Sequence, residues 1–301
     1  MTVRIRALII NWNGTRDTIE LLESLAREND ADYRLHAIVV DNGSIEAERL
    51  ALADGIRGMD NRLHVDAIWN SVNRGVPAAY NQAIQADGPV PDAFLRLDND
   101  VVVLPGGIRL LWSRLQAWRS TGIRIAGGNT RCYDAPNENN GGAIDIRLLS
   151  GRVRGWFPPE DMRSDGVLGC VMLLDRELVE ALLPQVFDEW LFLFGDESEL
   201  SLRARDRGWG TLYIAKPIAL HKGGASTEKV PLLSRTYSIR NGTYLALTYV
   251  RPRAWRPVVL ARLVLECVWK LLKLDFAACR SLAAGIAAGL GKRPARSERR
   301  D

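Results

Sequence analysis

The sequence lacks the signatures of several protein classes. Its four cysteines form no CxxC pair, which argues against a zinc cluster or a disulfide framework and fits a reducing compartment. It contains no GxxxxGK[ST] loop and no GxGxxG turn, so a P-loop NTPase or a dinucleotide-binding enzyme is disfavoured. With 40 Lys and Arg against 36 Asp and Glu, the formal net charge of +4 is too small to suggest nucleic acid as the partner.

The N-terminal segment also lacks the pattern of a signal peptide. The apolar stretch 3–10 is interrupted by Arg4 and Arg6, and no small-residue cleavage site follows it. We therefore expect a cytoplasmic protein. Charge is nevertheless unevenly placed, because residues 251–301 hold 12 basic and four acidic side chains. This basic tail favours an anionic surface such as a membrane, and a solvated basic tail is the alternative.

Strand signals alternate with helix signals along the first two thirds of the chain. Short apolar runs at 7–10, 37–40, 94–97, 169–174 and 211–215 predict strands. Helices are expected after the first run, with Thr15 or Asp17 as its cap, over 77–86, and after Asp175 and Asp196. This alternation predicts an α/β fold with a mostly parallel sheet. Polar clusters follow the strands, so we expect them to meet in one crevice at the carboxyl ends.

Two further regions interrupt this pattern. Residues 131–165 are rich in Gly, Pro, Asn and charge, and they are too long for a simple connection. Beyond Glu228 the sequence becomes helical, with Arg262, Glu266, Lys270 and Lys273 on one helix face and apolar residues on most of the rest.

So many charges argue against a transmembrane helix and favour an amphipathic helix on a membrane surface, with Trp255 and Trp269 as interface anchors. The alternative is a helix packed on the catalytic domain with its charged stripe in water. We predict a catalytic domain at 1–225 and a helical region at 226–301.

The strongest candidate for chemistry is the acidic triplet Asp98-Asn99-Asp100, which follows an apolar strand. Two carboxylates at a strand end can hold Mg²⁺ or Mn²⁺ together with a bound diphosphate. Such triplets are also frequent in surface turns. His221, one of three histidines and also placed after a strand, is a candidate third ligand, although a lone histidine is more often structural.

Three other clusters have both a functional and a structural interpretation. Asp41, in the turn after its strand, can accept hydrogen bonds from a base or ribose, or form an ordinary Asx turn. Asn73 and Arg74 precede a helix whose free N–H groups suit phosphate. Asp196 and Glu197 open another helix, where a carboxylate can act as general base or complement the helix dipole. Glu199, in the same turn, can pair with Arg203.

Taken in order, these pieces resemble the family 2 glycosyltransferases with the GT-A fold, particularly bacterial rhamnosyltransferase-like members. The resemblance covers about residues 3 to 245. The matching pieces are IINWNG at 9–14, VVDNGS at 39–44, NRG at 73–75 with Asn81, LDND at 97–100, Gly169-Cys170, FGDESEL at 194–200 with Arg203 and Gly208-Trp209, and HKGG at 221–224.

The resemblance implies roles for individual residues. Asp100 would ligate the metal and His221 would complete its site. Glu197 matches the catalytic base, with Asp196 as a competing candidate, because the family usually shows Glu-Asp where this chain has Asp-Glu. Glu199 likewise stands where Asp is more common. The residues expected to bind the nucleotide-sugar are Asn11, Asn13, Asp41, Asn73, Arg74, Asp98 and Asn99.

The expected function is therefore metal-dependent, inverting transfer of a sugar from a nucleotide-sugar to a glycan or lipid-linked acceptor in cell-surface polysaccharide synthesis. The resemblance favours dTDP-rhamnose as donor, with UDP-sugars second. The expected site of action is the inner face of the cell membrane, with peripheral attachment. The alternatives are a sugar nucleotidyltransferase, which would usually carry a Gly-rich phosphate loop after its first strand, and an inactive nucleotide-sugar-binding or membrane-assembly subunit.

Overall fold

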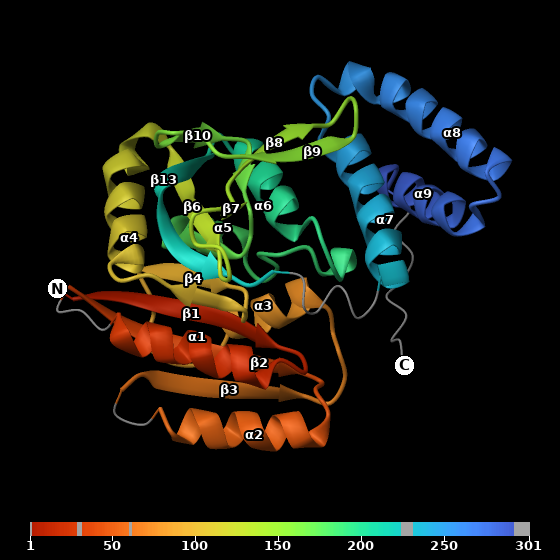
Figure 1. Cartoon of the computed structure of the whole chain (residues 1–301). Coiled ribbons are helices and arrows are strands. Elements are labelled where there is room, and N and C mark those ends of the chain that lie inside the picture. The colour runs from red at the N-terminus through yellow and green to blue at the C-terminus, as the bar shows by residue number, and fades with distance from the viewer. Residues whose placement is uncertain (1, 29–31, 60–61, 224–230, 292–301) are drawn as a thin grey trace.

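A central sheet with helices on both faces forms the body of the protein (Figure 1). The computed structural model describes residues 2–28, 32–59, 62–223 and 231–291. The sheet has ten strands, with the order β10-β13-β6-β12-β4-β1-β2-β3, and with β5 paired to β13 and β7 to β6. Its strands are β1 (Val3–Asn11), β2 (Tyr33–Asn42), β3 (His64–Asn70), β4 (Ala93–Leu97), β5 (Val101–Val103), β6 (Ile123–Cys132), β7 (Asn139–Gly141), β10 (Met162–Ser164), β12 (Val171–Asp175) and β13 (Gly210–His221).

Parallel pairing dominates one half of this sheet and mixed pairing the other. Strands β3, β2, β1 and β4 run parallel, as do β6 and β13, whereas β12 is antiparallel to both of its neighbours. The α/β prediction with a mostly parallel sheet is confirmed. Because β12 runs in reverse, its beginning lies beside the end of β4, where the Asp98 N–H donates to the Cys170 carbonyl at 3.0 Å. Sequence-distant polar residues therefore meet at one edge.

Helices cover both faces of the sheet, and the apolar side chains of a strand point alternately to one face and the other. Ile5, Ala7 and Ile9 of β1 face one core cluster, which includes Leu22 of α1, and Leu8 faces the other. Burying a leucine fully contributes about 1.5–3 kcal/mol, so this alternation fixes each strand's orientation. The helices are α1 (Thr15–Arg27), α2 (Glu46–Arg57), α3 (Val76–Ile84), α4 (Gly107–Trp118), α5 (Arg176–Leu182), α6 (Asp196–Arg205), α7 (Pro231–Tyr249), α8 (Arg256–Leu272) and α9 (Phe276–Gly289), with short 3₁₀ turns at Arg119–Thr121, Glu189–Leu191 and Arg253–Trp255.

The predicted cap of the first helix is wrong. The N-cap of α1 is Gly14, and it makes no side-chain capping bond. Glu48 of α2 replaces it, because its Oε2 accepts from the Thr15 N–H at 3.0 Å and its carbonyl accepts from the Thr15 hydroxyl at 2.9 Å. A carboxylate at a helix N-terminus satisfies a free N–H and complements the dipole, whether it comes from the same turn or from a neighbouring helix. Local sequence cannot reveal a partner 33 residues away.

The excursion expected over 131–165 is built largely of short strands. Besides β7 and β10 it forms β8 (Ala143–Arg147) and β9 (Arg152–Trp156), which join β11 (Gly166–Val167) in a separate three-stranded sheet. The turn of the β8–β9 hairpin touches α8, because a Cβ on Gly151 would lie 2.8 Å from an Arg262 nitrogen. This insertion therefore links the body of the protein to the C-terminal helices.

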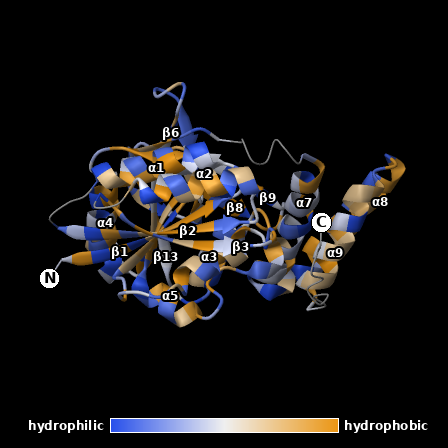
Figure 2. Cartoon of the chain, turned by 90° about the horizontal axis from the view of Figure 1, so that it is seen from below, coloured by the Kyte–Doolittle hydropathy of each residue, from blue (hydrophilic) through white to orange (hydrophobic). Residues whose placement is uncertain are grey.

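Helices α7, α8 and α9 pack together beside the sheet (Figure 1). The expected charged residues Arg262, Glu266 and Lys270 are half-buried, and Arg262 pairs with Glu266 at 3.3 Å. The exposed large side chains of α8 are instead apolar, and Figure 2 shows hydrophobic residues along much of this helix. Lys273, the fourth residue of the predicted charged face, is exposed at the end of α8. Among the described residues no helix is long and apolar enough to cross a membrane.

Parts of two sequence predictions lie outside the described residues. These are Gly224 of the HKGG motif and, within the expected helical region 226–301, residues 226–230 and 292–301.

Candidate functional site

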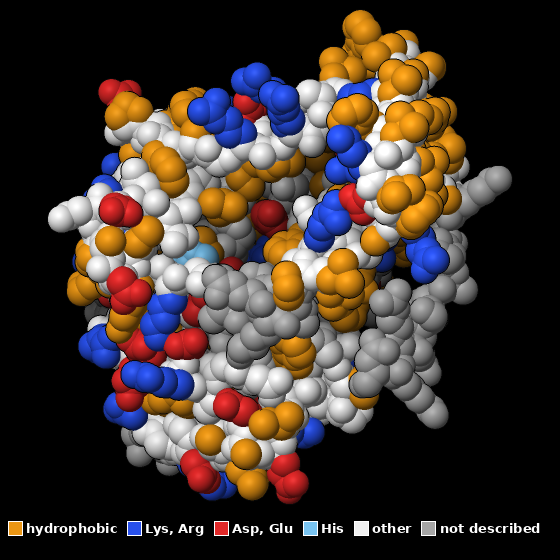
Figure 3. Space-filling view, turned by 45° about the vertical axis from the view of Figure 1, so that its right-hand side comes forward, with side chains coloured by type: hydrophobic (Ala, Val, Ile, Leu, Met, Phe, Trp, Pro, Cys, Tyr) orange, Lys and Arg blue, Asp and Glu red, His pale blue; other side chains and the backbone are white. Residues whose placement is uncertain are grey.

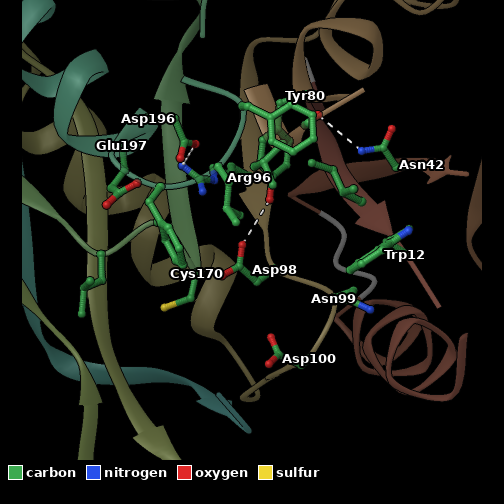
Figure 4. Close-up of a pocket in the computed structure, with 18 of the residues that line it drawn as sticks. Trp12, Asn42, Tyr80, Arg96, Asp98, Asn99, Asp100, Cys170, Asp196 and Glu197 are labelled. Carbon is green, nitrogen blue, oxygen red and sulfur yellow. Dashed lines mark hydrogen bonds and ion pairs between the residues drawn. The ribbon is translucent and has the colours of Figure 1, made fainter. Parts of the chain in front are cut away.

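A cavity of about 540 Å³ opens at the carboxyl ends of β1, β2 and β4. Such a volume suits a small-molecule ligand. Figure 3 shows acidic side chains inside this hollowed face, and Figure 4 shows the wall residues turned toward one another. The predicted residues Asn73, Asp98, Asn99, Asp100, Asp196, Glu197 and His221 all line the cavity, together with Ile10, Trp12, Asn42, Gly75, Val76, Tyr80, Arg96, Asn140, Leu168, Gly169, Cys170, Phe192, Leu193, Phe194, Gly223 and Leu233.

Asp98, Asp100 and His221 form one compact group of ligand atoms. One ligand atom from each lies within 4.8 Å of the other two. The chain brings them together because β4 ends just before Asp98, while β5 pairs with β13 and sets Val101 opposite His221. His221 Nε2 lies 3.2 Å from Asp100 Oδ1, and the Gly223 N–H donates to Asp100 Oδ2 at 3.1 Å.

The electrostatics of this group are those of a cation site. Burial lowers the pKa of His221, but the hydrogen bond to Asp100 and the neighbouring Cys170 raise that pKa to about 11. Burial raises the pKa of Asp98, with the Asp100 charge adding to it. A positive charge between these carboxylates is therefore favourable, whether it is carried by a proton or by a metal.

The residues also fit a divalent metal chemically. Two carboxylates and one imidazole nitrogen are ligands that Mn²⁺ and Mg²⁺ accept alongside phosphate oxygens. The orientation of the imidazole is fixed from behind, since His221 Nδ1 bonds Asn140 Oδ1 at 2.7 Å and leaves Nε2 turned to Asp100. Such an outer partner is typical of histidines that bind metals.

The two candidate bases, Asp196 and Glu197, differ in their contact with a buried arginine that was not predicted from the sequence. Arg96 of β4 lies under Gly169, and its Nη1 is 2.8 Å from Asp196 Oδ2 (Figure 4). Its guanidinium also lies over the ring of Tyr80, 4.7 Å from the centroid. Asp196 is only 2% exposed, so this ion pair neutralises a carboxylate that would otherwise be buried as an uncompensated charge. The signal for it was an arginine inside an apolar strand, in LRL before Asp98.

Glu197 is placed differently. It lines the cavity and is only partly buried. Burial in the cavity wall and the adjacent Asp196 charge raise its pKa to about 8, although Arg96 acts in the opposite direction. A carboxylate with such a pKa binds a proton far more readily than a solvated glutamate does.

A short strained loop holds the start of α6. Phe192, Phe194 and Gly195 have positive φ values of 63°, 65° and 80°. In the two phenylalanines this backbone conformation is strained, so contacts with the surrounding structure must hold it in place. Asn241 of α7 is buried, and its amide donates to the carbonyls of Leu191, Leu193 and Phe194 at 2.8–3.0 Å.

Other contacts complete this support. Arg240 donates to the carbonyls of Trp190 and Leu191, and the Val76 N–H of α3 donates to the Phe192 carbonyl at 2.7 Å. The loop is thereby fixed between α3 and α7, and it delivers Glu197 into the cavity wall.

The same helix contains another buried network. Glu199 pairs with Arg203 at 2.8 Å, as the spacing predicted, and accepts a hydrogen bond from the Tyr249 hydroxyl of α7. Burial raises the pKa of Glu199. Glu199 therefore joins α6 to α7.

The remaining predicted donor-binding residues lie outside the cavity lining and contact the neighbouring turns. Asn11 and Asp41 are fully buried, and the Asn11 amide donates to Asp41 Oδ2 at 2.9 Å. Asn13 Oδ1 accepts from the Ile45 N–H, and the Arg74 N–H donates to Asn42 Oδ1 at 3.0 Å. These four residues are not among those that line the cavity.

Two cavity residues near them, Trp12 and Asn42, were not singled out by the sequence. Asn42 was the missed partner of Asp41 in the DNGS turn, and it connects that turn to the NRG segment through Asn73 at 3.0 Å.

Comparison with known proteins agrees with this geometry. The family described as Glycosyl transferase family 2 matches residues 7–164, more than half of the chain, and the chain belongs to this family. None of the curated proteins compared with the sequence matches it.

Solved structures share the fold. A mannosyltransferase from Pyrobaculum calidifontis in complex with GDP-Man and Mn²⁺ superposes with a TM-score of 0.58 and 16% identity, over 98% of this chain and 77% of that one. TarS 1-349 of S. aureus in complex with UDP-GlcNAc gives 0.60 and 12%, over 98% and 82%. GalNAc-T7 with UDP, GalNAc and Mn²⁺ gives 0.57 and 13%, over 86% of this chain and 54% of that one. The chain thus has the GT-A fold of family 2 glycosyltransferases.

Proposed function

We propose that this protein is an inverting, metal-dependent glycosyltransferase that uses a nucleotide-sugar donor. The observation that carries the proposal is the convergence of two kinds of group on one cavity: a ligand set of Asp98, Asp100 and His221, and a carboxylate, Glu197, with a raised pKa. A bound Mg²⁺ or Mn²⁺ would stabilise the negative charge of the departing diphosphate. Asp100 and His221 are its proposed ligands, with Asp98 between the metal and the donor.

Glu197 is the proposed general base. As the acceptor oxygen forms its bond to the anomeric carbon, the bond from that carbon to the diphosphate breaks, and the acceptor's proton passes to Glu197. One displacement at carbon inverts its configuration. Asp196 serves poorly as this base because its carboxylate is engaged by Arg96. It is instead proposed to hold Arg96 and the first turn of α6 in place.

The donor is proposed to bind across the ends of β1, β2 and β4. Asn73, Asn99 and Asp98 can contact it directly from the cavity wall, while Asn11, Asn13, Asp41 and Arg74 support the turns that present Trp12 and Asn42. A deoxysugar nucleotide such as dTDP-rhamnose is the proposed donor from the sequence resemblance, with UDP-sugars as the second choice. The structurally similar proteins hold GDP-Man and UDP-GlcNAc, so the fold supports the nucleotide-sugar class.

The acceptor is proposed to be a glycan or lipid-linked saccharide of a cell-surface polysaccharide, reached at the inner face of the membrane. The apolar surface of α8 supports this placement. Leu265, Trp269 and Leu272 are 70%, 58% and 74% exposed, and Lys270 and Lys273 lie beside them. Figure 3 shows hydrophobic side chains gathered over the C-terminal helices. An apolar helix face bordered by cations suits an anionic lipid surface.

The catalytic proposal is tested by release of nucleoside diphosphate from candidate donors, selected first by thermal shift. We expect release with Mn²⁺, loss of release with chelator, and loss in Asp100→Ala. Turnover that is indifferent to chelator would remove the metal from the proposal. Donor binding without release under any condition would instead favour an inactive binding subunit.

Membrane attachment is tested by sedimentation with anionic liposomes. Truncation before α7 would disrupt α6, since Tyr249 bonds Glu199, so the test uses substitutions. Wild type should sediment with the liposomes, and the triple variant Leu265→Ser, Trp269→Ser, Leu272→Ser should stay in the supernatant. Equal recovery of both proteins in the supernatant would contradict attachment through this face.

A further inference from the structure

A second group of metal-ligating side chains lies at the opposite end of the sheet. His36 of β2 and His64 of β3 are two of the chain's three histidines, and Asp66 follows on β3. His36 precedes Asp41, at the end of the same strand, by five residues, which is about 17 Å along a strand. This group is therefore separate from the cavity and takes no part in the proposed transfer.

The geometry of the group is set by strand register. His36 and His64 are direct partners in the parallel β2–β3 ladder, and their rings stack at 4.1 Å with an angle of 5°. Asp66 Oδ2 lies 2.8 Å from His36 Nε2, and Asp66 Oδ1 lies 3.9 Å from His64 Nε2. One ligand atom from each of the three residues lies within 4.8 Å of the other two. The three groups thus bring two imidazole nitrogens and a carboxylate close together on these two strands.

We propose that His36, His64 and Asp66 bind a divalent transition metal, of which Zn²⁺ is the best match. Two imidazoles and one carboxylate are the three-ligand set of many zinc sites, with a fourth position left for water. Mg²⁺ and Ca²⁺, which prefer oxygen, suit this set poorly.

Small side-chain rotations reach such a site, because the 2.8 Å contact of His36 with Asp66 must lengthen and the 3.9 Å contact of His64 with Asp66 must shorten. Zinc bonds of about 2.0–2.2 Å place tetrahedral ligand atoms roughly 3.4 Å apart. His64 and Asp66 are exposed, so their side chains can rotate inward, whereas His36 is held against the Gly88 turn. The positive charge of the nearby Arg6 guanidinium repels a metal ion at this site, so we expect a moderate affinity for Zn²⁺.

The consequence of binding would fall on the edge of the sheet. β3 is the last strand in the sheet order, and within the described part of the chain no strand pairs with its outer edge. A metal that joins His36 on β2 to His64 and Asp66 on β3 clips this edge strand to its neighbour. Because it binds only the folded arrangement, it would raise the unfolding temperature.

The test is a calorimetric titration of full-length, tag-free, chelator-treated protein with ZnCl₂. Wild type should bind one more equivalent of Zn²⁺ than His64→Ala does, and Asp66→Asn should weaken that extra site at least tenfold. Glu46→Gln, which removes an exposed carboxylate elsewhere, should behave as wild type. Zn²⁺ should also raise the unfolding temperature of wild type more than that of His64→Ala.

Two outcomes would overturn the proposal. One is equal stoichiometry and affinity in wild type and His64→Ala, and the other is an extra site so weak that it reflects an adventitious ion only. Mn²⁺-supported transfer should be unchanged in His64→Ala, because the variant leaves the cavity intact. The two proposed metal sites therefore succeed or fail separately.

Discussion

Replacing Glu197 by glutamine should make the protein inactive and, at alkaline pH, more stable. Burial and the Asp196 charge raise the Glu197 pKa from 4.5 to about 8. The folded state therefore favours the protonated carboxyl, and stability is lost as the pH rises from the unfolded pKa through about 8. Each pKa unit corresponds to about 1.4 kcal/mol, which sets an upper limit of roughly 5 kcal/mol. Because Glu197 faces a water-accessible cavity, we expect about 2–3 kcal/mol.

Urea unfolding of wild type and Glu197→Gln at pH 5, 7 and 9 measures this difference. The variant should match wild type within about 1 kcal/mol at pH 5 and exceed it at pH 9, because glutamine never ionises. Wild-type kcat/KM should rise with pH as Glu197 loses its proton, with a midpoint near 8. A stability difference that is the same at all three pH values would refute the assigned pKa. Retained transfer in Glu197→Gln would refute its role as base.

Other substitutions test the groups around Glu197. Asp196→Asn should lower the free energy of unfolding, measured with denaturant, by about 3–5 kcal/mol, because it leaves the Arg96 guanidinium buried without its partner. A stability near that of wild type would argue against the ion pair. Asn241→Leu should lower the free energy of unfolding by about 2–4 kcal/mol, because three loop carbonyls lose their hydrogen-bond donor. The same variant should lower kcat more than it raises the donor KM. If activity falls only in proportion to the amount of folded protein, Asn241 has a structural role alone. On the same helix, Gly242→Ala should stabilise the protein by up to about 1 kcal/mol, because no atom of the described residues lies within 4 Å of the added Cβ. Gly169→Ala should instead destabilise by about 1–3 kcal/mol, because its Cβ would lie 2.6 Å from the Arg96 guanidinium; thermal shift on both glycine variants checks the contrast.

Much of the fold could be predicted because its signals are local. The strand after Ala93 and the helix after Asp196 follow from short-range periodicity and from polar residues at their ends. The order of polar turns also suffices to predict a crevice, since parallel strands present their carboxyl ends at the same edge. The cap of α1 could not be predicted, because Glu48 reaches Thr15 from another helix.

The sequence by itself determined which residue types stand at strand ends, and hence that Asp98, Asp100 and His221 are the metal-ligand candidates. The resemblance favours Glu197 over Asp196 as the base, and only the tertiary structure shows how the surroundings of the two carboxylates differ. The two are adjacent in sequence and both acidic, and they differ in that Arg96, one hundred residues before Asp196, lies against one and not the other. Pairing and burial depend on three-dimensional neighbours, so a carboxylate's charge state is a property of the fold rather than of its local sequence.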